Sequence, residues 1–275
     1  MRILIIGKGF VGDAIGFALS KEHTIFYHDP MKDENYDIRQ LDDLAGVVLC
    51  LPTPADNDGN CDDTLVAQYY EKIRKKRKDL HILIKSTTSI STLAALQSKQ
   101  DKFLTFSPEF LVADRARQDM VNAKFFIYSS SGLNGAKHWA DAFENCTKYG
   151  RTEAYYCDSM IEAGFVKYAI NSFLAMKVTF FNELKELFDT TTFNMGNFDN
   201  VTNLMALDSR IGESHMQVPG PDGLYGWGGA CFPKDTSEFY NMSIAQMKPL
   251  HLLGTAIQLN TEHRSKDAKN STDGE

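Results

Sequence analysis

The chain has 275 residues, 43% of them hydrophobic, which is enough for about two globular domains. Its formal net charge of −7 argues against a broad surface for nucleic acid or anionic membranes, because such surfaces need clustered Lys and Arg. The one basic run, residues 75–78, ends a predicted helix, where cations complement the helix dipole. We therefore expect neither nucleic acid nor a membrane as a partner.

The five cysteines are odd in number and none forms a CxxC pair, so neither a disulfide framework nor a zinc or other metal site is expected. The sequence contains no run of about 20 apolar residues that could span a bilayer. Its first residues read as a strand rather than as a signal peptide. The default expectation is a cytoplasmic, reduced protein.

A glycine-rich segment, Gly-Lys-Gly-Phe-Val-Gly at residues 7–12, follows a strand predicted over residues 3–6. Residues 13–20 read as a helix, and residues 24–28 read as a second strand that ends at Asp29. This order of strand, GxGxxG, helix, strand and acid is the full context of a dinucleotide-binding fingerprint. It predicts a Rossmann-like nucleotide-binding unit.

Each element of the fingerprint has a physical reason. Gly7 allows a tight turn, Gly9 lets the backbone approach a pyrophosphate, and Gly12 lets helix and strand pack closely. The helix N-terminus favours the phosphates. Asp29 stands where a carboxylate accepts hydrogen bonds from the adenosine ribose, and its charge would repel a 2′-phosphate. The expected cofactor is therefore NAD rather than NADP.

The alternation of strands and helices continues to about residue 158. Strands are predicted over residues 47–51, 82–84, 104–106, 125–128 and 153–157, and helices over residues 64–77, 90–98 and 134–146. Polar or Pro-containing stretches follow several strands, at residues 52–54, 86–88 and 107–111. In an open α/β sheet ligands bind at this edge, although each stretch alone is typical of an ordinary loop. We predict an α/β domain with a doubly wound parallel sheet over residues 1–158.

From residue 159 the pattern becomes helical. Residues 160–188 contain no proline and carry apolar residues at spacings of three or four, which predicts one amphipathic helix about 45 Å long. Lys167 and Asn171 share a face of this helix; alternatively, Lys167 snorkels and Asn171 faces solvent. Further helices are predicted over residues 203–208, 236–247 and 249–262. We expect a helical domain over residues 159–265 and a disordered tail over residues 266–275.

Residues 228–235, Gly-Gly-Ala-Cys-Phe-Pro-Lys-Asp, bring a thiol, a cation and a carboxylate close together. Pro233 suits the start of a helix, so Cys231 should lie just before a helix N-terminus with Lys234 nearby. Both features favour the reactive thiolate. The alternative is a buried structural cysteine on a Gly-rich turn. Asp235 is the carboxylate of this group.

Five stretches of the chain together match one family in its order. These stretches are residues 7–12 with Asp29; residues 86–87; residues 107–111; residues 167–171 with 181–184; and residues 210–212 followed by 228–235. Over about residues 1–265 the chain resembles the UDP-glucose/GDP-mannose (nucleotide-sugar) 6-dehydrogenases. The resemblance is strongest to the members that oxidise UDP-glucose.

The resemblance implies NAD-linked oxidation of a sugar C6 alcohol to a carboxylate in two steps, through a thioester at Cys231. It implies that Lys167 and Asn171 stabilise the C6 oxygen. The catalytic residues it implies are Cys231, Lys167, Asn171, Asp235, Glu109 and Thr87, with Asp235 and Thr87 positioning water or moving protons and Glu109 acting as the base for thioester hydrolysis.

The resemblance also implies the binding residues and the assembly. The expected substrate contacts are Glu109, Phe110, Leu111, Lys167, Asn171, Arg210, Tyr225, Gly228 and Cys231. The expected cofactor contacts are Gly7, Gly9, Phe10, Val11, Gly12, Asp29, Pro52, Thr53, Ser86, Thr87 and Lys234. A homodimer is expected through the long helix of residues 160–188.

Two departures from the family pattern are visible. Ala113, with Asp114 beside it, stands where members often carry a second Glu. Members also have a further C-terminal domain that closes over the nucleotide, and this sequence ends where that domain would begin. We therefore expect weak activity with poor discrimination between nucleotide bases.

Two other functions remain open. The β-hydroxyacid and 6-phosphogluconate dehydrogenases share the Rossmann domain, the long helix and a Lys-x-x-x-Asn motif, but their chemistry needs no thiol and yields one NADH instead of two. Alternatively, the chain is a shortened, non-catalytic homologue that binds NAD and pairs through its long helix. The joint presence of Cys231, Lys167, Asn171 and Asp235 argues against this last function.

Overall fold

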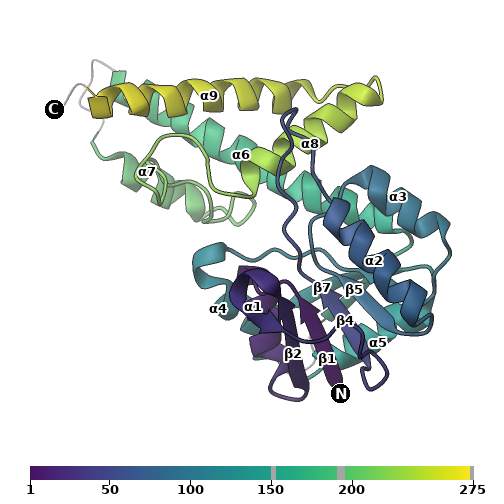
Figure 1. The fold of residues 1–275 in the computed structure, drawn as a ribbon. Coiled ribbons are helices and arrows are strands. Elements are labelled where there is room, and N and C mark those ends of the chain that lie inside the picture. Colours follow the sequence, from purple (N-terminus) through teal and green to yellow (C-terminus); the bar gives the residue numbers. More distant parts are fainter. Residues whose placement is uncertain (150–152, 191–195, 273–275) are drawn as a thin grey trace. The chain divides into compact units, whose positions relative to one another are not determined.

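A computed structural model of the protein describes residues 1–149, 153–190 and 196–272. The chain divides into two compact units, Met1–Pro54 with Cys61–Lys167 and Ala55–Asn60 with Tyr168–Glu275 (Figure 1). The expected boundary at residue 158 lies just before the long helix α6, Met160–Thr190. The two units divide inside that helix, after Lys167.

The first unit contains a sheet of eight strands in the part of the chain that the structure describes, in the order β3-β2-β1-β4-β5-β6-β7-β8. The strands are β1 (Arg2–Ile6), β2 (Thr24–Asp29), β3 (Glu34–Asn35), β4 (Gly46–Leu49), β5 (His81–Ile84), β6 (Leu104–Phe106), β7 (Phe125–Ser130) and β8 (Glu153–Cys157). Most neighbouring strands are parallel, but β3 pairs with β2 and β7 pairs with β6 in the antiparallel sense. The predicted Rossmann-like α/β fold class is confirmed, with a mixed rather than purely parallel sheet.

Helices cover both faces of this sheet (Figure 1). They are α1 (Phe10–Leu19), α2 (Thr64–Lys76), α3 (Ile90–Ser98), α4 (Ala116–Val121) and α5 (Leu133–Phe143), with short 3₁₀ helices at η1 (Pro30–Lys32) and η2 (Ala113–Arg115). On β1, Ile3 and Ile5 join the core under α1 and α5, whereas Leu4 and Ile6 join the core under α2 and α3. This alternation follows from the two-residue period of a strand.

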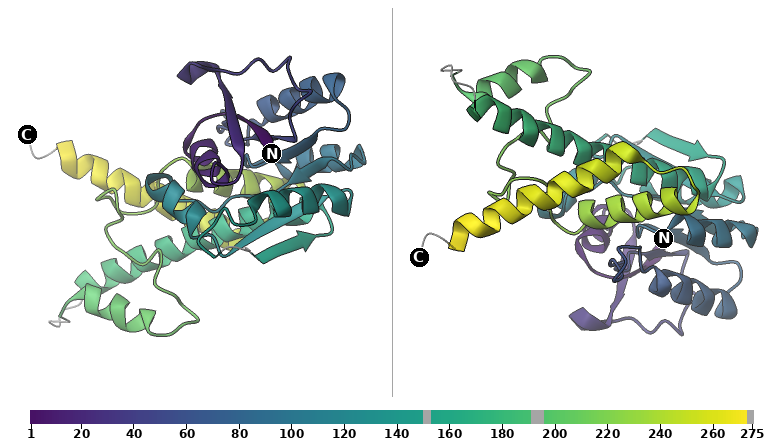
Figure 2. Two further views of the ribbon diagram at one scale, coloured as in Figure 1. Left: turned by 90° about the horizontal axis from the view of Figure 1, so that it is seen from below. Right: turned by 90° about the horizontal axis from the view of Figure 1, so that it is seen from above.

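The second unit is helical. It contains most of α6 together with α7 (Phe198–Ala206), α8 (Phe232–Ala245) and α9 (His251–Thr272), and α8 and α9 lie side by side as a helical hairpin (Figure 2). Its core includes Phe181, Phe198, Met216 and Val218. Among the described residues, no helix is both long enough and apolar enough to cross a membrane.

The C-terminal segment differs from the expectation of a disordered tail from residue 266. Helix α9 continues to Thr272. Residues 266–272 contain neither glycine nor proline, so nothing in them interrupts the helix. Residues 273–275 lie outside the described part of the chain.

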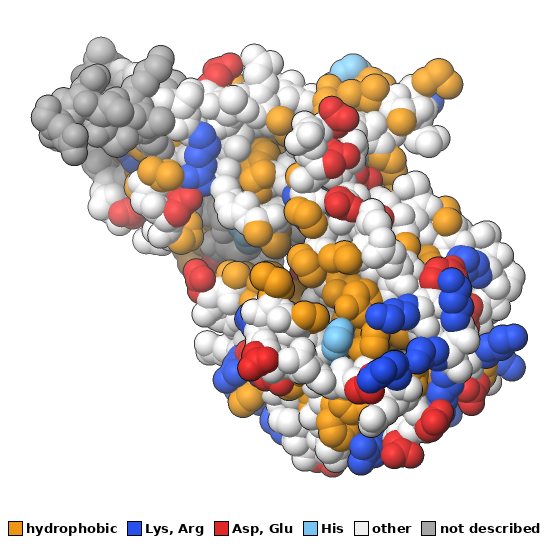
Figure 3. All heavy atoms as spheres, viewed as in Figure 1, with side chains coloured by type: hydrophobic (Ala, Val, Ile, Leu, Met, Phe, Trp, Pro, Cys, Tyr) orange, Lys and Arg blue, Asp and Glu red, His pale blue; other side chains and the backbone are white. Residues whose placement is uncertain are grey.

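The basic run of residues 75–78 lies at the end of α2, whose last turn carries Arg74, Lys75 and Lys76. Figure 3 shows a group of Lys and Arg side chains on that part of the first unit. This position matches the expected role of cations at a helix C-terminus.

We expect two stacked histidines to make the first unit sensitive to acid. The rings of His138 and His81 lie 3.7 Å apart, centroid to centroid. Burial, helped by the neighbouring His81 charge, lowers the pKa of His138 to about 4. The unfolded chain therefore binds a proton at His138 more readily than the folded chain does, and stability is lost as pH falls from about 6.5 toward 4.

We expect the melting temperature to fall over that pH range, and His138→Phe, which keeps a stacked ring, to flatten the fall. Thermal unfolding followed by circular dichroism between pH 7 and pH 4.5 checks this. An unchanged slope in the variant would contradict it.

Candidate active site

The glycine-rich turn of the first unit requires glycine at two positions. Gly7 has φ +92°, and a Cβ there would lie 2.3 Å from the carbonyl oxygen of Cys50. A Cβ on Gly12 would lie 1.9 Å from the carbonyl oxygen of Gly7. Gly9, which precedes α1, provides no side-chain cap and faces open space. The start of α1 is therefore open to an anionic group.

Asp29 ends β2 beside this turn. Its Oδ2 accepts a hydrogen bond from the Lys8 backbone N–H (2.7 Å), and its Oδ1 accepts one from Met31 N–H (3.1 Å). A carboxylate has about four acceptor positions, so about two remain for a pair of hydroxyl groups. The turn and Asp29 together fit a diphosphate next to a ribose.

The other predicted cofactor residues of the first unit lie near the carboxyl ends of β1, β4 and β5, the edge where ligands bind in such sheets. Ser86 is buried and donates to the carbonyl of Leu51 (2.9 Å). Pro52 and Thr53 come shortly after β4 in the sequence, and the Thr87 carbonyl accepts a hydrogen bond from the Cys61 thiol. The two others, Phe10 and Val11, begin α1.

A buried ion pair joins Lys167 and Glu109. Lys167 is 4% exposed and Glu109 6% exposed. The Lys167 Nζ donates to the Glu109 backbone carbonyl (2.7 Å) and to its Oε1 (3.3 Å), and Glu109 Oε2 accepts from Leu111 N–H (2.6 Å). The Phe110 ring centroid lies 5.4 Å from the same Nζ. Two predicted substrate residues, Glu109 and Phe110, thus lie against Lys167, and a third, Leu111, holds the Glu109 carboxylate.

In the second unit, Cys231 directly precedes α8 and Pro233 occupies the first turn, as the sequence predicts. Asp235, 1% exposed, accepts a hydrogen bond from Asn171 Nδ2 (2.6 Å) and pairs with Lys234. The backbone N–H of Asp235 donates to the Cys231 carbonyl (2.8 Å). The structure thus brings Asn171 of α6 to Asp235 of α8. Asp235 lies one helical turn after Cys231.

Lys167 and Asn171 are one turn apart on the continuous helix α6. Both side chains are buried, so the alternative in which Lys167 snorkels and Asn171 faces solvent is wrong. Sequence periodicity alone left both possibilities open.

The loop before Cys231 is fixed by residues that the sequence did not indicate. The Asn260 side chain accepts from Trp227 N–H (2.6 Å) and donates to the Trp227 carbonyl (3.0 Å). Arg264 donates to the same carbonyl (3.2 Å). A Cβ at Gly228 would lie 2.5 Å from the Arg264 guanidinium. Tyr225, also predicted, packs on the unit's core.

Arg210 is not brought to this loop in the described structure. Its side chain is 88% exposed and pairs with Asp208 at 2.6 Å. Lys177 of α6 instead holds the neighbouring segment through the carbonyls of Ile211 (3.0 Å) and Gly212 (3.0 Å). Arg210 is therefore not among the described residues that surround Gly228.

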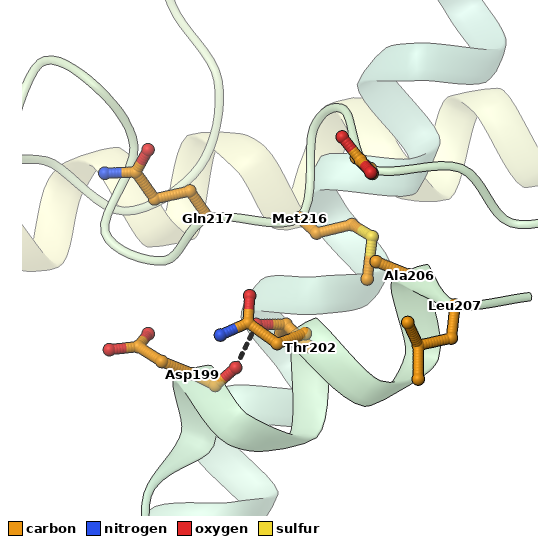
Figure 4. Close-up of a pocket in the computed structure, with 8 residues that line it drawn as sticks. Asp199, Thr202, Ala206, Leu207, Met216 and Gln217 are labelled. Carbon is orange, nitrogen blue, oxygen red and sulfur yellow. Dashed lines mark hydrogen bonds between the residues drawn. The ribbon is translucent and has the colours of Figure 1, made fainter.

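Two cavities differ in how they relate to these residues. The larger, about 610 Å³, lies between α7 and residues 213–217, where Thr202 donates to the Asp199 carbonyl (3.0 Å) (Figure 4). None of the predicted site residues lines it, so size alone does not mark it as the site. The smaller, about 120 Å³, lies in the first unit and is lined by Glu109, Phe110 and Leu111 among others.

Within the described residues, no group of three His, Cys, Asp or Glu side chains is placed to hold a metal ion. None of the five cysteines, all of which the structure describes, forms a disulfide; Cys231 is partly exposed. The two groups of residues contain a thiol, two lysines, carboxylates and an amide.

The fold is Rossmann-like α/β with a helical second unit, and each unit carries a group of buried polar residues. Residues 161–262 match the central domain of the UDP-glucose/GDP-mannose dehydrogenase family. The UDP-glucose 6-dehydrogenase of Campylobacter jejuni is 27% identical over 288 residues, covering 91% of this chain and 71% of that enzyme. Over these residues the chain is similar to nucleotide-sugar dehydrogenases.

Another relative and a solved structure are each matched over only part of their length. The UDP-glucose 6-dehydrogenase of Rickettsia felis is 27% identical, with 86% of this chain aligned to 52% of that enzyme. The structure of a UDP-glucose dehydrogenase from Pyrobaculum islandicum superposes with a TM-score of 0.76 at 20% identity, covering 95% of this chain and 68% of that one. The chain therefore spans only part of the length of these relatives.

Proposed function

We propose that the protein oxidises a nucleotide sugar, UDP-glucose first among them, at C6 to the uronic acid with NAD, through a thioester at Cys231. The observation that carries the proposal is the buried Asn171–Asp235 pair one turn along α8 from Cys231. The match of residues 161–262 to the central domain of the UDP-glucose/GDP-mannose dehydrogenase family supports the reaction class. The identity of the substrate and the thioester at Cys231 are parts of the proposal.

The residues of the glycine-rich turn fit NAD. We assign the diphosphate to Gly7, Gly9 and Gly12 at the start of α1, and the adenosine ribose to Asp29. When bound, NAD supplies the hydride acceptor for each oxidation. We assign further contacts with the cofactor to the residues that follow β4 and β5, namely Pro52, Thr53, Ser86 and Thr87.

Cys231 supplies the nucleophile in this proposal. After the alcohol has become an aldehyde, the Cys231 sulfur forms a bond to C6 and the aldehyde oxygen becomes an oxyanion. Loss of the second hydride from C6 leaves a thioester. Water then adds to the thioester carbon, the C–S bond breaks, and the thiolate is regenerated with the carboxylate product.

Lys167 and Asn171 are proposed to stabilise the C6 oxygen while it carries charge. The Lys167 ammonium has three N–H donors, and Glu109 accepts at two positions, so one donor remains for substrate. Asp235 holds the Asn171 amide in a fixed orientation. Glu109 is proposed as the base that takes the proton from the hydrolytic water.

A direct assay tests the proposal. Pure protein, NAD and one nucleotide sugar at a time (UDP-glucose, GDP-mannose or a UDP-N-acetyl sugar) are incubated while absorbance at the NADH wavelength is followed. We expect NADH with UDP-glucose and the uronic acid in the product. Absence of NADH with every nucleotide sugar would contradict the proposal.

The cofactor preference gives a separate prediction. Asp29→Asn keeps an acceptor for the Lys8 N–H but loses the charge, so we expect NAD binding to weaken about tenfold, the scale of one charged hydrogen bond. Binding of NADP should weaken less. Calorimetry of both cofactors checks this, and equal affinity of the unmodified protein for NAD and NADP would contradict it.

We also propose a homodimer through α6. Phe173, Phe180 and Leu187 recur every seven residues and are 63%, 52% and 62% exposed. That spacing places them on one stripe of the helix, and an exposed apolar stripe of this kind marks an interface.

Sedimentation velocity at micromolar concentration should give a dimer, and the double variant Phe173→Asp with Phe180→Asp should give a monomer. Asp189→Asn, a change at an exposed position nine residues from Phe180 and so on the opposite side of the helix, is the control; a monomeric unmodified protein would contradict the proposal.

A further inference from the structure

Lys85 is a buried charged residue that the proposed mechanism does not use. It directly follows β5 and is 1% exposed. Its Nζ donates to Ser107 Oγ (3.1 Å) and to the Pro108 carbonyl (3.2 Å). These two acceptors belong to the residues immediately before Glu109, so Lys85 holds the backbone from which the Glu109 carboxylate projects.

Lys85 and Glu109 also line the same cavity of about 120 Å³. Much of the rest of its wall is apolar and includes Phe110, Met120 and Phe126. Charges beside such a wall interact more strongly than charges in water, because the local dielectric is low. The ammonium of Lys85 and the carboxylate of Glu109 are therefore electrostatically coupled.

The charged and titratable groups around Lys85 come from several elements. Burial lowers the pKa of Lys85 to about 8; the Glu109 carboxylate and the Cys50 thiol oppose that shift, and the Lys167 ammonium adds to it. Asp119 of α4 and Lys124, which precedes β7, also line the cavity. When Lys85 is protonated its ammonium acts on Glu109 together with that of Lys167; when Lys85 is neutral, the ion pair with Lys167 remains.

We propose that Lys85 is a positioning residue for Glu109. It holds the Ser107-Pro108 backbone, and its positive charge acts on the Glu109 carboxylate. The link to thioester hydrolysis rests on the proposed function. The coupling itself belongs to the folded protein and exists whether or not the protein turns over substrate.

The first test needs no activity. Protein labelled with ¹³C and ¹⁵N in lysine is titrated by NMR, and the resonance missing from Lys85→Met identifies Lys85. We expect Lys85 to titrate near pH 8, and at lower pH in Glu109→Gln, because the carboxylate that favours the ammonium is gone. Asp119→Asn, the control carboxylate at the same cavity, should move it much less. Titration of Lys85 above pH 10, or no response to Glu109→Gln, would overturn the proposal.

The second test uses turnover with UDP-glucose. Lys85→Met should lower kcat about tenfold or more, change KM less than about threefold, and alter the pH profile near pH 8. Lys85→Arg, which keeps a charge, should recover part of kcat. Ser107→Ala, which removes one acceptor, should give a smaller loss and serves if Lys85→Met does not fold. Wild-type kcat and pH profile in both Lys85→Met and Ser107→Ala would overturn the proposal. An inactive unmodified protein would reject the proposed function, and the NMR titration would then decide the role of Lys85.

Discussion

Replacing Cys231 by serine should abolish formation of the sugar acid. A serine hydroxyl adds poorly to the aldehyde, and its alkoxide is a poor leaving group when water attacks the ester. We expect kcat for acid formation to fall at least a thousandfold, the scale seen when a catalytic nucleophile is removed. Rapid-quench analysis of products with NAD and UDP-glucose measures this directly.

Cys157, the other partly exposed cysteine, provides the matched control for this change. Cys157→Ser should leave the rate of acid formation unchanged. Acid formation at the wild-type rate by Cys231→Ala would rule out the nucleophile role and leave a structural cysteine ahead of α8.

Replacing Lys167 by methionine should damage both stability and turnover. The change leaves Glu109, which is 6% exposed, without its hydrogen-bonded cation. Breaking a buried pair from one side costs about 3–5 kcal/mol of folding free energy. Removing a donor to the charged C6 oxygen should lower kcat about a hundredfold or more. Denaturant unfolding and steady-state kinetics measure the two effects.

A double variant separates the two effects of Lys167. In Lys167→Met with Glu109→Gln the unpaired buried charge is gone, so much of the lost stability should return. Activity should not return, because the proposed oxygen donor and hydrolytic base are both absent. Recovery of activity together with stability would show that Lys167 acts only as a structural partner of Glu109.

Local sequence patterns predicted most of the first unit. The segment from β1 through the glycine turn to Asp29 could be predicted because local backbone geometry requires its residues. Gly7 has a positive φ, and Gly12 lies in close contact with the Gly7 carbonyl. The start of α6 at Met160 was also predicted, since a 3.6-residue period extends over a long segment without proline.

Features that depend on long-range pairing were not predicted. The antiparallel pairing of β7 with β6 and the short strand β3 leave no periodic signal in six or fewer residues. Helix α4, Ala116–Val121, is too short for its period to be recognised. Such elements are fixed by the neighbours that the finished fold provides.

The candidate site also combines residues that local patterns mark with residues that only long-range contacts reveal. Residue types and spacing singled out Cys231 and Asp235, whereas the role expected of Asn171 came from the family resemblance. Lys85 stood at a predicted strand end, but only the three-dimensional structure shows that its ammonium is buried behind Glu109. Asn260 and Arg264 hold the loop at Trp227 from a helix more than thirty residues later, and nothing in their local sequence marks that role.

The number of NADH molecules formed for each nucleotide sugar consumed tests the central proposal most directly. Limiting UDP-glucose is converted to completion with excess NAD, and NADH and the remaining UDP-glucose are quantified together. A two-step oxidation through Cys231 predicts two NADH for each sugar, with the uronic acid as product. One NADH for each sugar, with the aldehyde or another singly oxidised product, would contradict it.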